Sequence, residues 1–300
     1  MTSRDVEIFQ EHRAFLLGLA YRILGSKSDA EDVLQDIFIK WYQQPKSDIV
    51  TPKAWLTTIC TRQSIDLLRS AYKSRTEYIG TWLPEPYHAE DDMCIESDFT
   101  LSTMFLLLLE KLSAKERAAY LLHDIFDYDY SELSKILEEN QNYCRKLISR
   151  AREKVVFEHD LSFTPPTPQQ IKILHIFQHA VQSGNPEQLT ALLTQDVHLF
   201  ADGGGKVSAI SKPLLSIEQV TQFFEKLLFQ AWHAFQWKLQ RINGNIGFDF
   251  FDAHGKCIMV VTFGFSANQL IQNIYIQRNP DKIKGQHQVA LYKNRQNNYF

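Results

Sequence analysis

Apolar side chains recur every three or four residues through most of residues 5–75, which is the spacing of amphipathic helices. In the segment 29–41 the apolar positions are Ala30, Val33, Leu34, Ile37, Phe38 and Trp41. Ser28 and Glu31 have the spacing of a capping box, so this helix is expected to begin there. Another helix is expected to begin at Thr51-Pro52, because proline suits the first turn of a helix.

Residues 99–157 follow the same helical pattern. Ser113 and Glu116 have the spacing of a second capping box. The apolar positions Leu133, Ile136 and Leu137 predict a short helix, and 138–140 (Glu-Glu-Asn) predicts a turn. The next helix has one apolar face, formed by Cys144, Leu147, Ile148, Ala151 and Val155. Helix, short turn and helix in this order predict a helix-turn-helix.

Beyond the proline-rich segment 164–168 the period changes. We expect helices at 168–183, 186–194 and 216–229, and strands at 195–201, 206–211, 234–242, 246–252, 256–265 and 268–278. Asn243-Gly244 and His254-Gly255 are suited to hairpin turns. Helices followed by a long antiparallel meander predict an α+β domain with a curved sheet. Ile258–Phe265 is apolar on both faces, so this strand is expected to be covered on both sides.

The composition predicts a soluble protein of two or three domains, because 300 residues exceed what one core usually holds. The net charge of −3 means that any contact with nucleic acid depends on local basic patches. The 4 cysteines include no CxxC pair, which argues against a zinc site or disulfide framework and favours the cytoplasm. The N-terminus lacks the apolar core of a signal peptide, and the longest apolar run, Met104–Leu109, is too short to cross a bilayer.

Two helices carry basic side chains that could meet DNA. Arg62 and Arg69 lie seven residues apart and therefore share a face, with Trp55 two turns and Thr58 one turn before Arg62. A core tryptophan beside exposed arginines explains the same pattern. The helix-turn-helix gives the stronger signal, because its second helix has a basic and polar face formed by Arg145, Lys146, Ser149 and Arg152.

Other candidate sites are weaker. The carboxylates of 29–41 fit a protein-docking surface or an ordinary solvated face. The loop 202–206 (DGGGK) could hold an anion, but it lacks the P-loop spacing, and a permissive hairpin or interface loop explains it better. His175 and His179 lie on one helix face without the glutamate of an HExxH motif, which favours a structural role over metal binding. The sequence therefore predicts no catalytic residue, metal or cofactor.

Three stretches resemble the extracytoplasmic-function sigma factors of bacteria. DAEDVLQDIFIKW (29–41) is similar to their helix that docks on the RNA polymerase β′ coiled coil. PKAWLTTICTRQSIDLLRSA (52–71) is similar to their minus-ten helix, and SELSKILEENQNYCRKLISRAREK (131–154) to their minus-thirty-five helix-turn-helix. Three further motifs resemble a subgroup with a fused C-terminal SnoaL-like (nuclear-transport-factor-two-like) domain: WLPEP (82–86), DGGGK (202–206) and NPDKI (279–283). The resemblance covers about residues 5–284 in one order.

The resemblance implies a multidomain fold of two all-α sigma domains and an α+β cone. The expected boundaries are 1–75 for sigma domain 2, 76–98 for an acidic linker with WLPEP, 99–160 for sigma domain 4, 161–168 for a proline-rich linker, 169–284 for the SnoaL-like domain and 285–300 for a tail. The implied partners are core RNA polymerase, through its β′ coiled coil and β flap, and promoter DNA, with no membrane and no cofactor. A small ligand in the cone stays open.

The resemblance also assigns roles to residues. Polymerase would meet Asp29, Glu31, Asp32 and Gln35. Promoter DNA would meet Trp55, Thr58, Arg62, Asp66, Arg69, Arg145, Lys146, Ser149 and Arg152. The regulatory contact between domains would involve Trp82, Leu83, Pro84, Glu85, Pro86, Asp202, Gly203, Gly204, Gly205, Lys206, Asn279, Pro280, Asp281 and Lys282. The chain departs from the family where Glu138 replaces the usual glycine of the turn and Ser134 replaces a small alanine.

The resulting expectation is a cytoplasmic sigma factor, not an enzyme, whose C-terminal domain regulates it in cis. Two alternatives remain. The cone could be a cyclase or isomerase that uses a polar residue such as Asp202, His175 or His179. The chain could also be an ordinary operator-binding regulator that does not replace another sigma factor.

Overall fold

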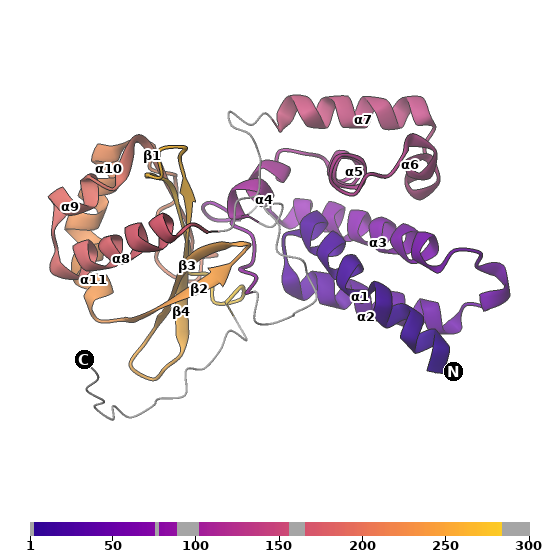
Figure 1. Ribbon diagram of the computed structural model, residues 1–300, viewed down its shortest axis with the longest axis horizontal. Coiled ribbons are helices and arrows are strands. Elements are labelled where there is room, and N and C mark those ends of the chain that lie inside the picture. Colours follow the sequence, from indigo (N-terminus) through magenta and orange to yellow (C-terminus); the bar gives the residue numbers. More distant parts are fainter. Residues whose placement is uncertain (1–2, 76–77, 89–101, 156–165, 284–300) are drawn as a thin grey trace. The chain divides into compact units, whose positions relative to one another are not determined.

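The computed structural model describes residues 3–75, 78–88, 102–155 and 166–283, which form two compact units (Figure 1). The first unit holds the described residues up to 78, those from 83 to 155, and the turn 241–245. The second unit holds 79–82 and the remaining described residues from 166 onward. Most of the expected acidic linker, part of the proline-rich linker and the tail lie outside the described residues.

The first unit begins with a three-helix layer of α1 (Ser3–Leu24), α2 (Lys27–Gln43) and α3 (Pro52–Arg75), with a short 3-10 turn, η1 (Lys46–Asp48), before α3. The expected start of α3 at Pro52 is confirmed. The expected capping box at Ser28 is wrong, because α2 begins at Lys27, two residues before the start that a Ser28 cap implies. Its cap is Ser26, whose hydroxyl accepts a hydrogen bond from the Asp29 amide at 3.2 Å.

The same unit continues with α4 (Thr103–Leu109), α5 (Ala114–Tyr120), the π-helical turn η3 (Leu121–Ile125), α6 (Tyr130–Leu137) and α7 (Gln141–Lys154). The capping box of Ser113 and Glu116 is confirmed, and the expected helix-turn-helix is α6, a turn and α7. A further capping box, Asp129 with Glu132, starts α6 and was not expected. Helix α3 packs against α5 and α6, and one continuous hydrophobic core runs through these helices (Figure 1).

Glu138 ends α6 in the left-handed conformation, with φ 54° and ψ 44°. A residue with a side chain is strained there by about 1 kcal/mol, whereas glycine is not. The turn therefore keeps the geometry of a helix-turn-helix without the residue that suits it best.

The second unit is a curved sheet with helices packed on one face (Figure 1). Its helical segments are α8 (Pro168–Ser183), α9 (Pro186–Thr190), α10 (Ile217–Phe223), the π-helical turn η4 (Phe224–Leu228) and α11 (Phe229–His233). Its strands are β1 (Leu193–Asp202), β2 (Gln236–Ile242), β3 (Asn245–Phe251), β4 (Cys257–Phe265) and β5 (Ile271–Gln277), in the order β1-β5-β4-β3-β2. The expected α+β class is confirmed.

The sheet differs from a plain meander because β1 joins it parallel to β5, whereas β3–β4 and β4–β5 are antiparallel. The strand expected at 206–211 is wrong. The chain turns sharply after β1, and 203–212 is a mostly exposed loop before the bridge between Leu199 and Leu214. The helix expected at 186–194 ends at Thr190, since Leu193 already belongs to β1.

Aromatic rings fill the space between the sheet and α8, α10 and α11. The buried members are Phe177, Phe224, Trp232, Phe248, Phe250 and Phe263. Phe177 packs edge-on against Phe224 and Phe263, with ring centroids 5.7 and 5.0 Å apart. The burial expected on both faces of β4 is confirmed for Met259–Phe263. Asn243 and Gly244 both have positive φ, as expected of this hairpin turn.

Candidate functional site

Helix α2 presents a mixed acidic and apolar face. Asp32 and Gln35 are exposed, whereas Asp29 and Glu31 are half-buried. Ile39 and Tyr42 follow on the same face of the helix and are 52% and 55% exposed. Sequence reasoning missed these two residues, although apolar side chains outside the core stripe were a signal for them. Exposed apolar groups beside carboxylates are suited to docking a protein.

Arg62 on α3 is bound to the end of α6. Its guanidinium donates to the carbonyl oxygens of Lys135 at 2.7 Å and Ile136 at 2.8 Å. It also lies 2.7 Å from the Glu138 carboxylate. The last carbonyls of a helix lack partners within the helix and carry partial negative charge, so a guanidinium is a favourable cap. The expected DNA-contacting arginine of one helical region therefore caps a helix of the other.

The remaining expected residues of α3 are arranged along the same helix. Asp66 and Arg69 are exposed and lie 3.6 Å apart, so they form a surface ion pair. Trp55 is half-buried, with its ring 5.7 Å from that of Trp41. The Thr58 hydroxyl donates to the Ala54 carbonyl at 2.7 Å. Trp55 therefore has a packing role, whatever else it contacts.

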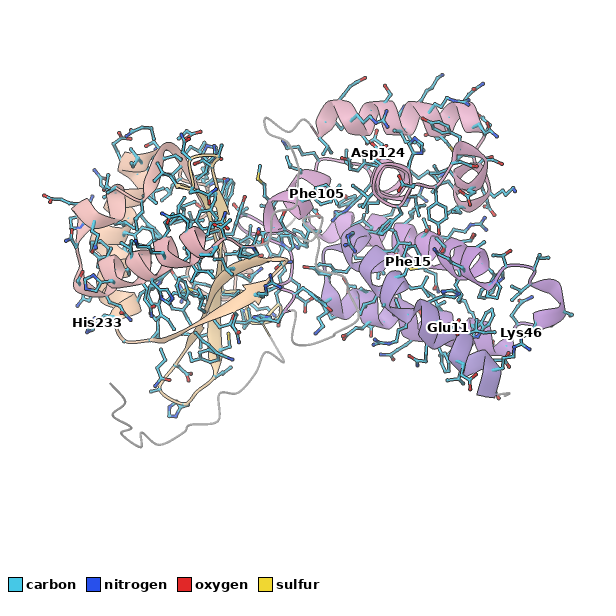
Figure 2. The ribbon with its side chains drawn as sticks, viewed as in Figure 1. Glu11, Phe15, Lys46, Phe105, Asp124 and His233 are labelled. Atoms are coloured by element: carbon cyan, nitrogen blue, oxygen red, sulfur yellow. The ribbon has the colours of Figure 1, made fainter. Side chains whose placement is uncertain are left out.

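The basic face of α7 points away from the core. Arg145, Lys146, Ser149 and Arg152 are exposed. Arg145 stacks over the Tyr130 ring at 4.7 Å. Arg152 binds both carboxylate oxygens of Asp124, labelled in Figure 2, at 2.7 and 2.9 Å. The structure thus brings the four expected side chains to one solvent-facing surface.

Glu116 fastens α7 to α5. Its carboxylate accepts from Arg150 at 2.8 Å, from Lys154 at 2.7 Å and from the Ser113 amide at 3.0 Å. Burial opposes ionisation of this carboxyl, but these hydrogen bonds outweigh it and lower its pKa to about 2. The charge of Glu116 therefore positions the helix that carries the basic face.

Glu85, the acidic residue of WLPEP, sits in the first unit at the start of α2. One carboxylate oxygen accepts from the Lys27 amide at 2.8 Å and from the Ser28 amide at 3.2 Å. A carboxylate is stabilised there by the free amides and by the helix dipole. The Tyr21 hydroxyl donates to the Glu85 carbonyl oxygen at 2.7 Å, and the Asn243 amide donates to that hydroxyl at 2.5 Å. Burial raises the pKa of Tyr21, which keeps it a neutral donor.

Trp82, the first residue of WLPEP, belongs to the second unit. The Lys282 ammonium lies 4.1 Å from the centre of its ring and 2.7 Å from a carboxylate oxygen of Asp202. Asp202 is 1% exposed, so this ion pair is buried. Lys206 forms a second, exposed ion pair with Asp281. The DGGGK and NPDKI segments therefore meet each other, as well as Trp82.

The glycines of DGGGK make room for the neighbouring segments. A Cβ on Gly204 would lie 2.4 Å from the Asn279 side chain, and one on Gly203 would lie 2.3 Å from the Val207 carbonyl oxygen. A Cβ on Gly205 would lie 3.2 Å from Ile79. The loop is thus a packing surface, which agrees with an interface loop rather than an anion cradle.

The residues named for an enzyme do not converge. His175 and His179 are both exposed on α8. The carboxylate of Asp202 is bound to Lys282. Among the residues that the structure describes, no cluster of three or more His, Cys, Asp or Glu side chains could hold a metal ion.

No helix within the described parts of the chain has both the length and the apolar character needed to cross a membrane.

Two family models match the first unit: Sigma-70 region 2 over residues 8–74 and Sigma-70 region 4 over residues 102–155. The chain is 32% identical over 226 residues to the ECF RNA polymerase sigma factor SigJ of Mycobacterium tuberculosis, covering 73% of this chain and 72% of that protein. It is 26% identical over 196 residues to the probable ECF RNA polymerase sigma factor SigI of the same species, covering 63% of this chain and 67% of that one.

The crystal structure of Mycobacterium tuberculosis SigJ is similar over most of this chain. It aligns with a TM-score of 0.74 at 26% identity and covers 92% of this chain and 97% of the other. The similarity therefore includes the C-terminal sheet as well as the helical regions.

Proposed function

Because this chain belongs to the extracytoplasmic-function family of RNA polymerase sigma factors, we propose that it directs core RNA polymerase to specific promoters. In this proposal α1–α3 form sigma domain 2, α4–α7 form sigma domain 4, and the C-terminal SnoaL-like domain regulates both in cis. The chain would act in the cytoplasm, where core polymerase works. The C-terminal domain would regulate rather than catalyse.

The observation that carries the regulatory part of the proposal is the position of Arg62. This arginine lies on the helix proposed to read the minus-ten element, yet its guanidinium is bonded to the last carbonyls of α6. Arginine binds phosphates and base edges through the same N–H groups. Promoter opening would therefore require α3 and α6 to separate, and this arrangement would be a closed form.

Polymerase would be met by the exposed face of α2. Asp29, Glu31, Asp32 and Gln35 would face a basic partner, and Ile39 and Tyr42 would add apolar contact. Promoter DNA would be met by Trp55, Thr58, Arg62, Asp66 and Arg69 on α3, and by Arg145, Lys146, Ser149 and Arg152 on α7. Neither DNA surface need bind tightly alone, because one polymerase would hold both at high effective concentration.

The WLPEP motif would connect the regulatory domain to these surfaces. Trp82 is held in the second unit by Lys282, and three residues later Glu85 caps α2 in the first unit. A change in the Asp202–Lys282 pair would therefore shift Trp82, and a short, proline-stiffened segment would transmit this shift to Glu85 and α2. The remaining residues assigned to this contact, from DGGGK and NPDKI, would hold Asp202 and Lys282 in position beside Trp82.

Transcription reconstituted from purified core polymerase, a promoter library and the full chain tests the proposal. We expect promoter-dependent transcripts, fewer with Arg62→Ala, and altered output with Trp82→Ala. Lys172→Ala, an exposed change on α8, is the control and should leave output unchanged. An operator-binding regulator would start no transcripts with core polymerase alone. Equal output from the Trp82 variant and the unchanged chain, over a range of polymerase concentrations, would contradict regulation through WLPEP.

A further inference from the structure

A cavity of about 300 Å³ lies in the second unit between the sheet and the helices η4 and α11. Its walls are mainly apolar and include Phe223, Leu227, Trp232, Met259 and Ile276. Its volume is at the lower end of the range for small-molecule sites.

One cationic side chain, Arg278, lines this otherwise uncharged cavity. It follows β5 and is held by two bonds: its backbone amide donates to the Asp202 carbonyl at 2.7 Å, and its Nη1 donates to the Ser208 carbonyl at 2.6 Å. Burial lowers the pKa of this guanidinium. Within the described residues no carboxylate forms an ion pair with Arg278, so most of its N–H groups are available to a ligand.

We propose that this cavity binds a small carboxylic acid with an apolar body, its carboxylate on Arg278 and its body against Trp232 and Met259. A half-buried guanidinium without a counter-ion is costly, and a carboxylate matches its planar pair of donors. A cation would be repelled, and a neutral apolar molecule would leave Arg278 uncompensated. The apolar walls favour a ligand whose single charge lies at one end.

The cavity also adjoins the segment proposed to carry regulation, and this step rests on the proposed function. Ser208 and Ile210 form one wall. A Cβ on Gly80 would lie 3.8 Å from the Ile210 carbonyl oxygen, so the same loop touches the chain just before Trp82. An occupied cavity would then bias the position of 79–82, which is how a metabolite could act on transcription.

The test is a calorimetric titration of the full-length chain with octanoate, 1-octanol and octylamine, which share one apolar body. We expect octanoate to bind about tenfold or more tightly than octanol, since hydrogen bonds to charged groups contribute that much. Octylamine should bind least. Equal affinities for octanoate and octanol, tighter binding of the amine, or no saturable binding of octanoate would overturn the proposal.

Three variants make the test specific. Arg278→Met should remove the preference for octanoate over octanol while octanol binding persists. Lys212→Met removes an exposed charge of the same loop without altering the cavity lining. It is the matched control and should change neither the preference for octanoate nor the binding of octanol. Ala231→Phe places a ring at an exposed lining position and should block both ligands. These measurements need no polymerase, so a chain that binds octanoate but starts no transcripts contradicts only the proposed function.

Discussion

The guanidinium of Arg62 lies 2.7 Å from the carboxylate of Glu138, although the two residues are far apart in the chain. Their helices, α3 and α6, contribute to one hydrophobic core. Glu138 occupies the left-handed position of the turn, which suits glycine best. The side chain that strains the turn thus also reaches the arginine that caps α6. Because the Glu138 side chain is 72% exposed, this ion pair contributes less than about 1 kcal/mol to the free energy of unfolding.

Two substitutions at Glu138 should separate strain from charge. Glu138→Gln keeps the left-handed side chain and removes the ion pair, so the free energy of unfolding should fall by less than about 1 kcal/mol. Glu138→Gly removes both and should be more stable than the glutamine variant by about 1 kcal/mol, because glycine has no left-handed strain. Denaturant unfolding of the full chain measures both. A glycine variant that is less stable than the glutamine variant would contradict this account.

Glu116 should make the packing of α7 on α5 sensitive to acid. Its folded pKa of about 2 is below the ordinary 4.5, so it contributes stability above about pH 4.5 that is lost as the pH falls toward 2. The shift corresponds to at most about 3 kcal/mol, and less in practice because Arg150 and Lys154 reach solvent. Glu116→Gln should therefore destabilise the chain at pH 7.

The measurement is the difference in unfolding free energy between the unchanged chain and Glu116→Gln from pH 7 to pH 3. The difference should be constant above about pH 5 and should shrink below it. Glu153→Gln is a suitable control, since this carboxylate is exposed and is hydrogen-bonded to the Ser149 hydroxyl of its own helix. If the difference between the unchanged chain and Glu116→Gln does not change with pH, the shape of the Glu116 side chain and not its charge explains its role.

The sequence predicted the boundaries of helices correctly where neighbouring residues determine them. The period of α8 and the capping box of Ser113 gave correct boundaries, because the residues that decide them are neighbours in sequence. The start of α2 was misplaced by competition among nearby hydroxyls. The strand expected at 206–211 failed because alternating polarity cannot reveal that the chain leaves the sheet after Asp202.

The sequence predicted which segments belong to the site, but not which residues form hydrogen bonds and ion pairs with each other. The resemblance supplied WLPEP, DGGGK and NPDKI as segments that belong together, and Trp82, Asp202 and Lys282 do meet in one cluster. Nothing in the local sequence indicates that Arg62 caps α6 or that Glu85 caps α2. Such contacts depend on tertiary packing between segments that are far apart in the chain, so periodicity and composition have no means to specify them.

The buried pair of Asp202 and Lys282 should show strong coupling in a double-mutant cycle. Asp202→Asn or Lys282→Met alone leaves a poorly compensated charge, with an expected loss of about 3 kcal/mol or more. The double variant should lose less than the sum, with a coupling free energy of about 1–3 kcal/mol.

The exposed pair of Lys206 and Asp281 is the matched control for that cycle, since its side chains are 55% and 42% exposed. A cycle with Lys206→Met and Asp281→Asn should give a coupling below about 1 kcal/mol. Chemical denaturation of the four chains in each cycle gives the coupling. Equal coupling in the two pairs would mean that burial of Asp202 does not strengthen its bond to Lys282.

Gly204 and Gly205 should respond differently to the same added methyl group. Both have positive φ, 62° and 68°, so alanine brings left-handed strain of about 1 kcal/mol at each position. At Gly204 the new Cβ would also lie 2.4 Å from the Asn279 side chain, whose oxygen accepts from the Asp281 amide at 3.0 Å. At Gly205 it would meet the flexible end of Ile79 at 3.2 Å.

Gly204→Ala should therefore lower the free energy of unfolding by about 1–3 kcal/mol more than Gly205→Ala, which is the usual cost of overpacking. Asn279→Ala provides the decisive background, because it removes the atoms that the new Cβ would strike. In that background the two alanine variants should cost nearly the same, since only the left-handed strain remains. A difference that persists without the Asn279 side chain would place the strain of Gly204 in the backbone of the loop, and the contact between DGGGK and NPDKI would then not explain this glycine.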